Sequence, residues 1–289
     1  MKYKKTILIL AAIVIITAWI YFDMKNIEVT RTELHFPELA DNISQLKIVH
    51  LSDLHGKSFG EGNDEIVEAI NKEKPDIIIC SGDMINSHDD DGSAFVNLLQ
   101  SLEGKYPVFY AYGNHDQYSR LNTSRIFESY IQNLIESGCY ILDDDKIAIE
   151  KDELPITIYG LSSIPYNKKV NKTFLNKEAF NADFISEKIG KPSNNLNILI
   201  AHDPSWLDIY SQWGADLVLS GHIHGGAVRL PFLGGVVSPN RELFPKYDAG
   251  LFEKGNTFLY VSRGLGTSVE RIRVFNRPEI AVIIISTEN

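Results

Sequence analysis

The sequence predicts an α/β fold in which two mixed β-sheets pack on each other and helices cover the outside. Short apolar runs rich in β-branched residues alternate with amphipathic stretches of helical length in the first half of the chain. After Cys139 the pattern changes to pairs of strands. The 289 residues are 44% hydrophobic and 23% charged, a composition typical of globular proteins that excludes collagen-like and disordered chains. This mixture of patterns favours two packed sheets over a single one.

The strands and helices follow one another without a long linker or an internal repeat, so one domain is expected. The first half gives three strands at 47–52, 76–81 and 108–112, each followed by a helix, at 63–73, 94–102 and 123–137. These are successive βαβ units. The second half gives strands at 146–150, 156–161, 197–202, 217–220, 258–262 and 280–286, with a helix at 205–213.

The N-terminus indicates a membrane segment. Residues 7–22 carry no charge and follow Lys2, Lys4 and Lys5. Such a stretch spans about 24 Å as a helix, slightly less than a hydrocarbon core of about 30 Å, and fits a transmembrane anchor or a signal peptide. Aromatic residues end the stretch where a cleavage site needs small ones, which favours the anchor. We therefore expect an anchor at 1–25, with cytoplasmic lysines, and an extracytoplasmic domain at 26–289 in a single-pass protein of the cell membrane.

Charge and cysteine content exclude several classes of partner. The chain has 28 Lys and Arg against 38 Asp and Glu, a net charge of −10, so nucleic acid is not expected as a structural partner. Cys80 and Cys139 are the only cysteines, which excludes a disulfide scaffold and a multi-cysteine zinc site. Both lie in or beside apolar runs, which favours buried thiols; a single bridge between them is the alternative.

Polar side chains that can bind metals follow the early strands where each strand ends. The clusters are Asp53-Leu54-His55, Gly82-Asp83 and Gly113-Asn114-His115-Asp116. Asp53 and Asp83 are 30 residues apart, and Asp83 and Asn114 are 31 apart, about one βαβ unit. Because the carboxyl ends of parallel strands lie side by side, these side chains should converge. On an extended backbone Asp53 and His55 would point to one face and hold one cation.

Two later clusters, His202-Asp203 and His222-Ile223-His224, also lie at strand ends. In the second cluster the two histidines are two residues apart, as Asp53 and His55 are. Together the clusters supply seven candidate ligands: Asp53, His55, Asp83, Asn114, His202, His222 and His224. Carboxylate, amide and imidazole donors without thiolates favour two divalent ions of the Mn, Fe or Zn type. The alternative, surface or core residues without a metal, requires every cluster to fall at a strand end by accident. His35, His50 and His88 fit no repeated spacing and are interpreted as structural or exposed.

These five blocks, in this order, resemble the motifs of the calcineurin-like metallophosphoesterase superfamily. The stretches 220–231, 259–268 and 276–280 resemble its bacterial membrane-anchored branch, so that the likeness covers nearly the whole chain. The resemblance implies a four-layer α/β/β/α sandwich. It also implies a metal-dependent phosphoric ester hydrolase in which two ions share a hydroxide that attacks phosphorus in a monoester or diester.

The resemblance also implies roles for single residues. One ion would take Asp53, His55, Asp83 and His224, and the other would take Asp83, Asn114, His202 and His222, with Asp83 shared. His115 would protonate the leaving oxygen or stabilise its charge, and Asp116 would orient the ring of His115. Asn114 and His115 would also contact the substrate.

Some positions depart from the superfamily. Asn86 stands where many members have a supporting aspartate, and Ala227 replaces a usual glutamine. No arginine occurs between Asp83 and Gln100, which argues against a protein phosphatase. Arg263, in a glycine-rich turn, could hold a substrate phosphate or serve only the structure.

The predicted anchor favours lipid-linked or cell-envelope phosphates as substrates. The arginine stretch Arg263, Arg271, Arg273 and Arg277 could guide such an anionic substrate. The rival functions are a metal-binding scaffold of the same fold without turnover and a phosphodiesterase for soluble nucleotides.

Overall fold

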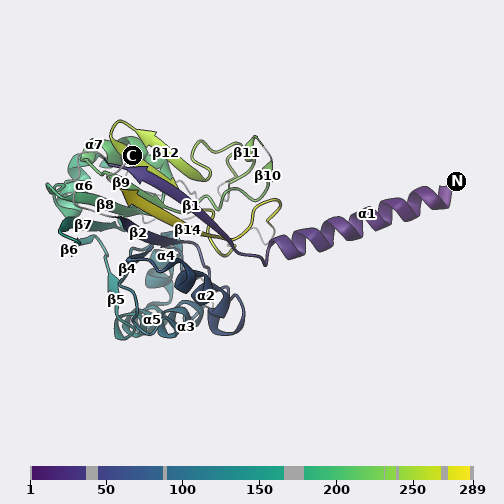
Figure 1. Ribbon diagram of the computed structural model, residues 1–289, viewed down its shortest axis with the longest axis horizontal. Helices are drawn as coiled ribbons and strands as arrows, with labels where there is room; N and C mark the ends of the chain where they lie inside the picture. Colours follow the sequence, from purple (N-terminus) through teal and green to yellow (C-terminus); the bar gives the residue numbers. More distant parts are fainter. Residues whose placement is uncertain are drawn as a thin grey trace.

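Two six-stranded sheets pack face to face, and helices cover their outer faces (Figure 1). The computed structural model describes residues 2–36, 45–86, 90–165, 179–230, 232–238, 241–267 and 273–286. The expected α/β two-sheet architecture is therefore confirmed for this part of the chain.

The first sheet has a parallel half and a mixed half. Its order is β1 (Glu28–His35), β14 (Glu279–Ser286), β2 (Leu46–Leu51), β3 (Ile77–Cys80), β4 (Val108–Tyr110) and β5 (Cys139–Ile141). Strands β2 to β5 are parallel, β14 runs antiparallel to β2, and β1 runs parallel to β14. The parallel half is the one that the βαβ pattern predicted.

Helices of the first half pack on the outer face of this sheet. They are α2 (Asp64–Glu73), preceded by the 3₁₀ turn η1 (Glu61–Asn63), then α3 (Ser93–Ser101), α4 (Asn114–Asn122) and α5 (Ser124–Glu136). The apolar side chains of α2, α3 and α5 form one buried cluster with the outward-facing residues of β2 and β3.

The second sheet has parallel strands in its centre and an antiparallel strand at each edge. Its order is β12 (Gly250–Lys254), β13 (Thr257–Val261), β9 (Leu217–Ser220), β8 (Leu196–Ala201), β7 (Leu154–Leu161) and β6 (Asp145–Lys151). Helix α6 (Ala182–Ile189), the 3₁₀ turn η3 (Pro204–Trp206) and helix α7 (Leu207–Trp213) cover its outer face. A hairpin, β10 (Arg229–Leu230) and β11 (Gly234–Gly235), stands apart from both sheets.

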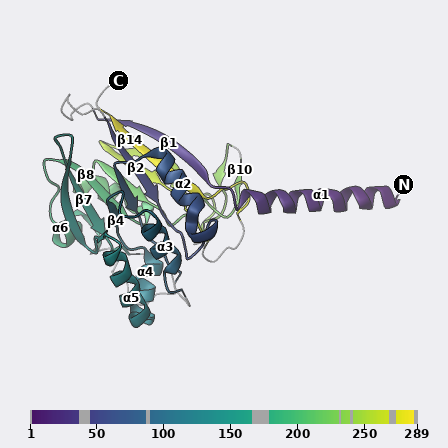
Figure 2. The same cartoon turned by 60° about the horizontal axis from the view of Figure 1, so that its bottom comes forward.

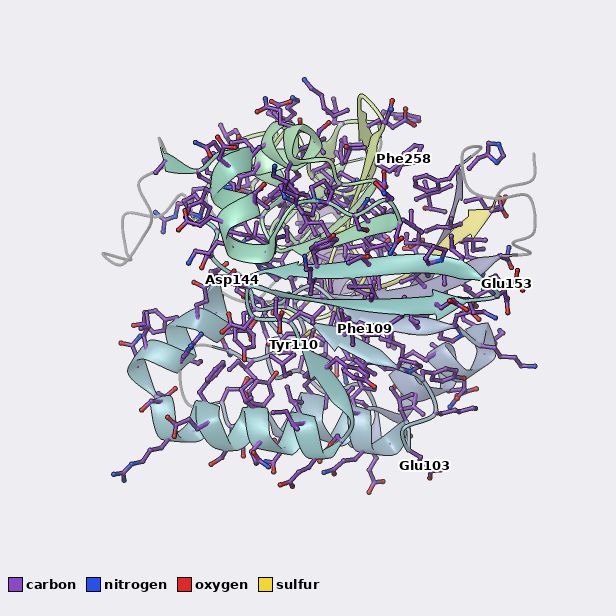
Figure 3. All side chains as sticks on the ribbon, turned by 90° about the vertical axis from the view of Figure 1, so that its left-hand side faces the viewer. Glu103, Phe109, Tyr110, Asp144, Glu153 and Phe258 are labelled. Carbon is purple, nitrogen blue, oxygen red and sulfur yellow. The ribbon has the colours of Figure 1, made fainter. Side chains whose placement is uncertain are left out.

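The alternation of side chains along the strands builds the two buried layers on either side of the first sheet. Phe109 and Tyr110 are neighbours on β4 (Figure 3), yet Phe109 packs between the sheets and Tyr110 packs against the helices. Strand β2 alternates in the same way, with Ile48 between the sheets and Val49 on the helix side. Each side chain of this size stabilises the fold by about 1.5–3 kcal/mol when fully buried.

Helix α1 (Lys2–Asp23) projects from the sheets in both views (Figures 1 and 2). Among the residues that the structure describes, no helix is both long enough and apolar enough for a bilayer crossing. The predicted transmembrane helix is therefore wrong, and so is the single-pass location derived from it. Charged residues at both ends of α1 confine its uncharged stretch to 6–22, about 25 Å of helix, whereas a crossing needs about 30 Å. The boundary between 1–25 and 26–289 stays a prediction.

Cys80 and Cys139 are both buried and free, so the bridge that the sequence left open is not formed. Strand β4 lies between the strands β3 and β5 that carry them.

Candidate metal centre

The structure gathers all seven predicted ligands at the carboxyl ends of strands from both sheets. Asp53 and His55 follow β2, Asp83 follows β3, and Asn114 begins α4 after β4. His202 follows β8, and His222 and His224 follow β9. All seven side chains belong to buried residues, with Asp53 fully buried and Asn114 the most exposed at 9%. The convergence that was expected from strand-end spacing is thus present in the fold, although the metal-binding role of each residue stays a prediction.

The backbone that aims these side chains is left-handed, not extended. The φ angles are 51° at Asp53, 49° at His55, 55° at Asp83, 70° at His222 and 54° at His224. Non-glycine residues rarely adopt such angles, which cost on the order of 1–3 kcal/mol each and cluster at functional sites. The sequence predicts that Asp53 and His55, two residues apart on an extended backbone, point to one face. That prediction of an extended backbone is wrong, because tight turns bring the two side chains together.

The loops after β3 and β4 can approach each other closely because the residue before Asp83 is a glycine. Gly82 has φ +102°, and a Cβ atom at this position would lie 2.5 Å from the backbone nitrogen of Gly113. Only glycine combines this angle with this space. It therefore lets the loop after β4 reach Asp83.

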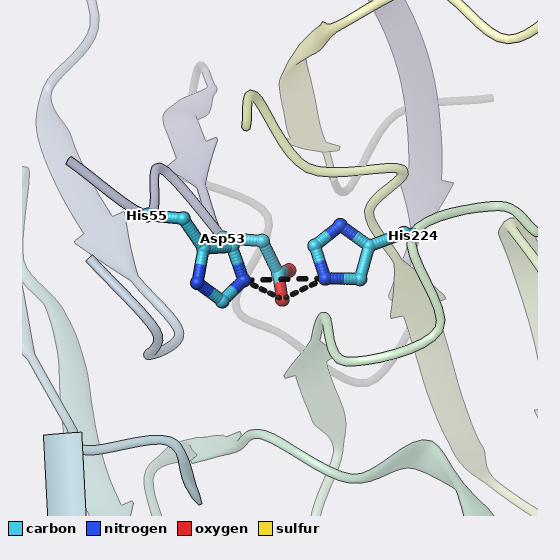
Figure 4. A group of neighbouring side chains, drawn as sticks. All are labelled: Asp53, His55 and His224. Carbon is cyan, nitrogen blue, oxygen red and sulfur yellow. Dashed lines mark hydrogen bonds and ion pairs between the residues drawn. The ribbon is translucent and has the colours of Figure 1, made fainter. Parts of the chain in front are cut away.

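Asp53, His55 and His224 form the first donor group (Figure 4). The Oδ1 atom of Asp53 lies 3.3 Å from Nε2 of His224 and 3.8 Å from Nε2 of His55. Burial holds the pKa of both histidines well below its usual range, so each ring stays neutral and keeps a nitrogen lone pair. Two lone pairs and a carboxylate oxygen facing one point suit a cation.

Asp83, His202 and His222 form the second donor group. The Nδ1 atom of His202 lies 2.6 Å from the carbonyl oxygen of Ser81, and because a carbonyl only accepts, Nδ1 carries the proton and donates it. The other ring nitrogen of His202, Nε2, then faces Asp83 Oδ2 at 3.0 Å. A backbone carbonyl that fixes the ring in this way is typical of metal-binding histidines.

Opposite charges lie close together in the second donor group. Burial alone would lower the pKa of His202, but the carboxylates of Asp83 and Asp53 raise it to about 10. Burial alone would raise the pKa of Asp83, but His202 and His115 hold it well below its usual range. Without a metal, His202 and Asp83 are therefore a buried ion pair.

The two donor groups adjoin through Asp83 and His55. Asp83 also forms a group with His55 and His115, and its Oδ2 atom lies 3.8 Å from Nε2 of His55. The buried Oδ1 atom of Asn114 has no hydrogen-bond partner among the residues that the structure describes. A buried acceptor without a partner beside convergent nitrogen and oxygen donors fits a ligand of a divalent ion. The donor set therefore suits two divalent metals.

His115 and Asp116 lie beside the donor groups. His115 is half-buried, its backbone nitrogen donates to Asp83 Oδ1 at 2.7 Å, and its ring centre lies 4.7 Å from that of His55. Asp116 is buried, which raises its pKa to about 7, and its Oδ2 atom accepts hydrogen bonds from the backbone nitrogens of Asp83 and Gly113. Asp116 therefore ties together the loops after β3 and β4. Its predicted role in orienting the His115 ring stays a prediction.

Arg263 lies in an ion-pair network between β1 and β14. Its Nη1 atom lies 3.1 Å from Glu28, its Nη2 atom lies 3.3 Å from Glu279, and its backbone nitrogen donates to Glu279 at 2.7 Å. These contacts support a structural role for Arg263. Its contact with a substrate phosphate stays a prediction.

Sequence reasoning missed the place of Arg273. The sequence predicts that Arg273 guides an anionic substrate together with neighbouring arginines, yet only 2% of the residue is exposed. Its Nη2 atom donates to the carbonyl oxygen of Gly266 and lies 3.4 Å from Nδ1 of His224. The prediction that Arg273 guides substrates at the surface is therefore wrong, and Arg271 lies outside the described residues.

A chain of small polar side chains behind Asp53 was also missed. Ser52 donates to Asp53 Oδ2 at 2.6 Å, Ser81 donates to Ser52 at 2.9 Å, and a 2.7 Å hydrogen bond joins Ser81 to His50. The available signal was the serine directly before Asp53 and a second serine two residues before Asp83.

Comparisons with known proteins identify the family of this chain. Residues 46–226 match the family model described as calcineurin-like phosphoesterase. The chain is 30% identical over 280 residues to the uncharacterized metallophosphoesterase Cj0846 of Campylobacter jejuni, covering 96% of this chain and 68% of that protein.

Two further relatives have more specific names. The phosphodiesterase YaeI of Escherichia coli is 26% identical and is matched over 89% of this chain and 87% of its own length. The UDP-2,3-diacylglucosamine pyrophosphatase LpxG of Chlamydia muridarum is 26% identical, over 95% of this chain and 94% of its own. The likeness to a membrane-anchored branch stays a prediction. The family match covers more than half of the chain and includes all five motif blocks, so this protein belongs to the calcineurin-like phosphoesterase family.

Proposed function

We propose that this protein hydrolyses phosphate esters with two divalent ions held between the two donor groups. The position of Asp83 carries this proposal. Its Oδ2 atom faces His202 Nε2 at 3.0 Å and His55 Nε2 at 3.8 Å, so one carboxylate reaches both groups. A shared carboxylate is what a pair of ions about 3.5–4 Å apart requires.

The proposed ligands of one ion are Asp53, His55, Asp83 and His224, and those of the other are Asp83, Asn114, His202 and His222. Nitrogen and oxygen donors favour Mn, Fe or Zn. When bound, these ions would activate water and withdraw charge from the phosphoryl oxygens.

The remaining chemistry belongs to His115 and its surroundings. His115 is half-buried, and its ring lies beside that of His55 at the edge of the donor groups. We assign to it the proton that the leaving oxygen needs when the P–O bond breaks. Asn114 would contact the phosphoryl group. Asp116 would keep Asp83 and the loop after β4 in place through its two backbone hydrogen bonds.

The names of two relatives support a substrate whose phosphate carries two substituents. YaeI is described as a phosphodiesterase, and LpxG as a pyrophosphatase for a diacylated sugar nucleotide. We therefore propose a diester or diphosphate with a lipid or cell-envelope component as the substrate class.

Hydrolysis of bis-p-nitrophenyl phosphate tests this function. The purified full chain should release p-nitrophenol with added Mn²⁺, and a chelator should abolish the release. A chain that binds two ions without releasing product would instead be the metal-binding scaffold. A panel of lipid, nucleotide and wall-polymer phosphates would then identify the substrate class.

A further inference from the structure

Large apolar side chains gather on the segment that follows the metal centre. We call the residues Leu230, Phe232, Leu233, Leu243 and Phe244 the apolar rim. Their exposed fractions are 38%, 107%, 64%, 67% and 58% respectively. Single exposed apolar residues are common on soluble proteins, but five within one segment of 15 residues are not. The cluster therefore needs an explanation.

The backbone holds the apolar rim outward by specific contacts. Asp248 accepts hydrogen bonds from Arg229 Nη1 at 2.9 Å and from the backbone nitrogen of Gly235 at 2.6 Å, which fixes the base of the β10–β11 hairpin. Phe232 and Phe244 have φ angles of 68° and 52°, a conformation that bulky residues rarely adopt. Strained backbone of this kind is retained mainly where a ligand is held or function requires it.

The apolar rim is continuous with the loop that carries His222 and His224. Asn276 donates to the carbonyl oxygens of His224, at 2.7 Å, and of Gly226, at 2.6 Å. The next residue, Ala227, donates its backbone N–H to Val237 within the rim segment at 2.8 Å. Ile223, between the two histidines, lines a recess of about 220 Å³ together with Ser205, Asp208 and Lys246. Its other lining residues are Glu242, Pro245 and Tyr247, so the recess is lined both by the loop of the metal centre and by residues next to Leu243 and Phe244.

The end of α1 lies on the same side of the molecule. Figures 1 and 2 both show β10 beside the point where α1 leaves the sheets. Trp19 of α1 packs edge-on against Phe275, with ring centres 4.6 Å apart, and Phe22 is 62% exposed. The apolar rim thus extends toward a second exposed apolar surface.

Charge favours a lipid surface over a protein as the occupant. The exposed side chains of Arg241 and Lys246 flank the rim residues, with the acidic Glu242 between them, so this stretch is net positive in a chain of net charge −10. Protruding aromatic and aliphatic residues beside cations are typical of segments that enter the interface of an anionic bilayer.

We propose that the apolar rim inserts into an anionic lipid surface and places the recess beside Ile223 at the lipid headgroups. The contact needs no helix across the bilayer. It is independent of the proposed hydrolysis, whereas its use in meeting lipid-borne phosphate esters rests on that function.

A fluorescent label on the rim tests the insertion. Because Cys80 and Cys139 are buried, a Leu233→Cys variant of the full chain can be labelled at one site with the polarity-sensitive dye NBD. The matched control is Leu121→Cys on α4, whose leucine is similarly exposed at 59%. With vesicles of phosphatidylcholine and phosphatidylglycerol, the label at 233 should brighten severalfold and be quenched by doxyl lipids, while the label at 121 should not. Vesicle-bound protein with an unchanged signal at 233 would overturn the proposal.

A second variant separates lipid contact from self-association and from catalysis. Phe232→Ser/Phe244→Ser should weaken vesicle binding at least tenfold and lower activity on a vesicle-borne phosphodiester, while activity on bis-p-nitrophenyl phosphate is unchanged. Equal loss on both substrates would contradict the proposal, as would a wild-type dimer in sedimentation that this variant dissociates. If the wild type cleaves neither substrate yet its label at 233 enters vesicles, the proposed function fails and the lipid contact stands.

Discussion

The Nε2 atoms of His55 and His224 lie 3.2 Å apart, on rings that stack with their centres 5.0 Å apart and an interplanar angle of 21° (Figure 4). The two rings come from the ends of β2 and β9, in different sheets. The junction of the sheets, rather than either sheet alone, therefore forms this half of the centre.

Metal binding should stabilise the protein through this pair. A ligand that binds only the folded state at 100 times its Kd adds about 2.7 kcal/mol per site. We expect Mn²⁺ to raise the melting temperature and a chelator to lower it. The His224→Asn variant should lose most of the rise in melting temperature that comes from the ion in the first donor group. His35→Asn, on strand β1, serves as the control and should keep the full rise. The same metal-induced shift in both variants would contradict the first donor group.

Asp83 should control both ions together. Asp83→Asn keeps the shape of the side chain but removes the charge that faces both donor groups, so elemental analysis should show a loss of both metals and of activity. Asp203→Asn is the matched control, because Asp203 is equally buried and caps a 3₁₀ turn by accepting from Ser205 at 2.9 Å, which asparagine also does. Two ions retained in Asp83→Asn would refute the shared carboxylate.

His115 should affect turnover and not metal content. His115→Asn should keep two ions and reduce kcat by about 10²–10⁴-fold, since proton transfer to the leaving oxygen is lost. The loss should be larger for alkyl leaving groups, which need the proton more, than for p-nitrophenolate. Equal losses across a series of leaving groups would argue against a general acid.

Metal uptake should depend on pH through His202. Its pKa of about 10 in the metal-free protein means that the ring is protonated at pH 7, and it must release that proton to bind a metal. Apparent affinity should therefore rise about tenfold per pH unit between pH 7 and 9. Calorimetry in two buffers of different ionisation enthalpy should detect about one proton released per chain. Heats that do not depend on the buffer would exclude this ion pair.

The same raised pKa affects the stability of the metal-free protein. A group whose pKa is higher when folded contributes stability that is complete below its unfolded value, 6.5 for histidine, and is lost as pH rises toward about 10. Chemical denaturation in chelator should show this loss, and saturating metal should remove it.

Arg263 should matter for stability more than for substrate affinity. Arg263→Met leaves the buried carboxylate of Glu279 without its cation, which should cost about 3–5 kcal/mol of unfolding free energy. Adding Glu279→Gln should recover part of that loss, because the unpaired charge is gone. KM for bis-p-nitrophenyl phosphate should stay unchanged. A raised KM with normal stability would instead support the predicted contact with a substrate phosphate.

The positions of most strands could be predicted from the sequence, because buried strands need continuous apolar residues. The expected strand at 217–220 matches β9 (Leu217–Ser220), and the helix at 123–137 contains α5 (Ser124–Glu136). Strand β1 was missed because Glu28–His35 is an edge strand, half-exposed and largely polar. Pairing with β14, more than 240 residues away in sequence, makes it a strand.

The sequence by itself determined the two-sheet class, the seven candidate ligands and their convergence, because strand periodicity and the parallel order place strand ends at one edge. Only the tertiary structure decided how the ligands are aimed, because the left-handed turns at Asp53 and His55 form hydrogen bonds with a loop about 30 residues away. The backbone nitrogen of Asp53 donates to the Gly82 carbonyl at 3.0 Å, and that of His55 donates to the Asp83 carbonyl at 3.1 Å. Tertiary packing also buried Arg273 beside His224 and exposed Phe232. A side chain's burial depends on what lies opposite it in space, and residues distant in the sequence supply those neighbours.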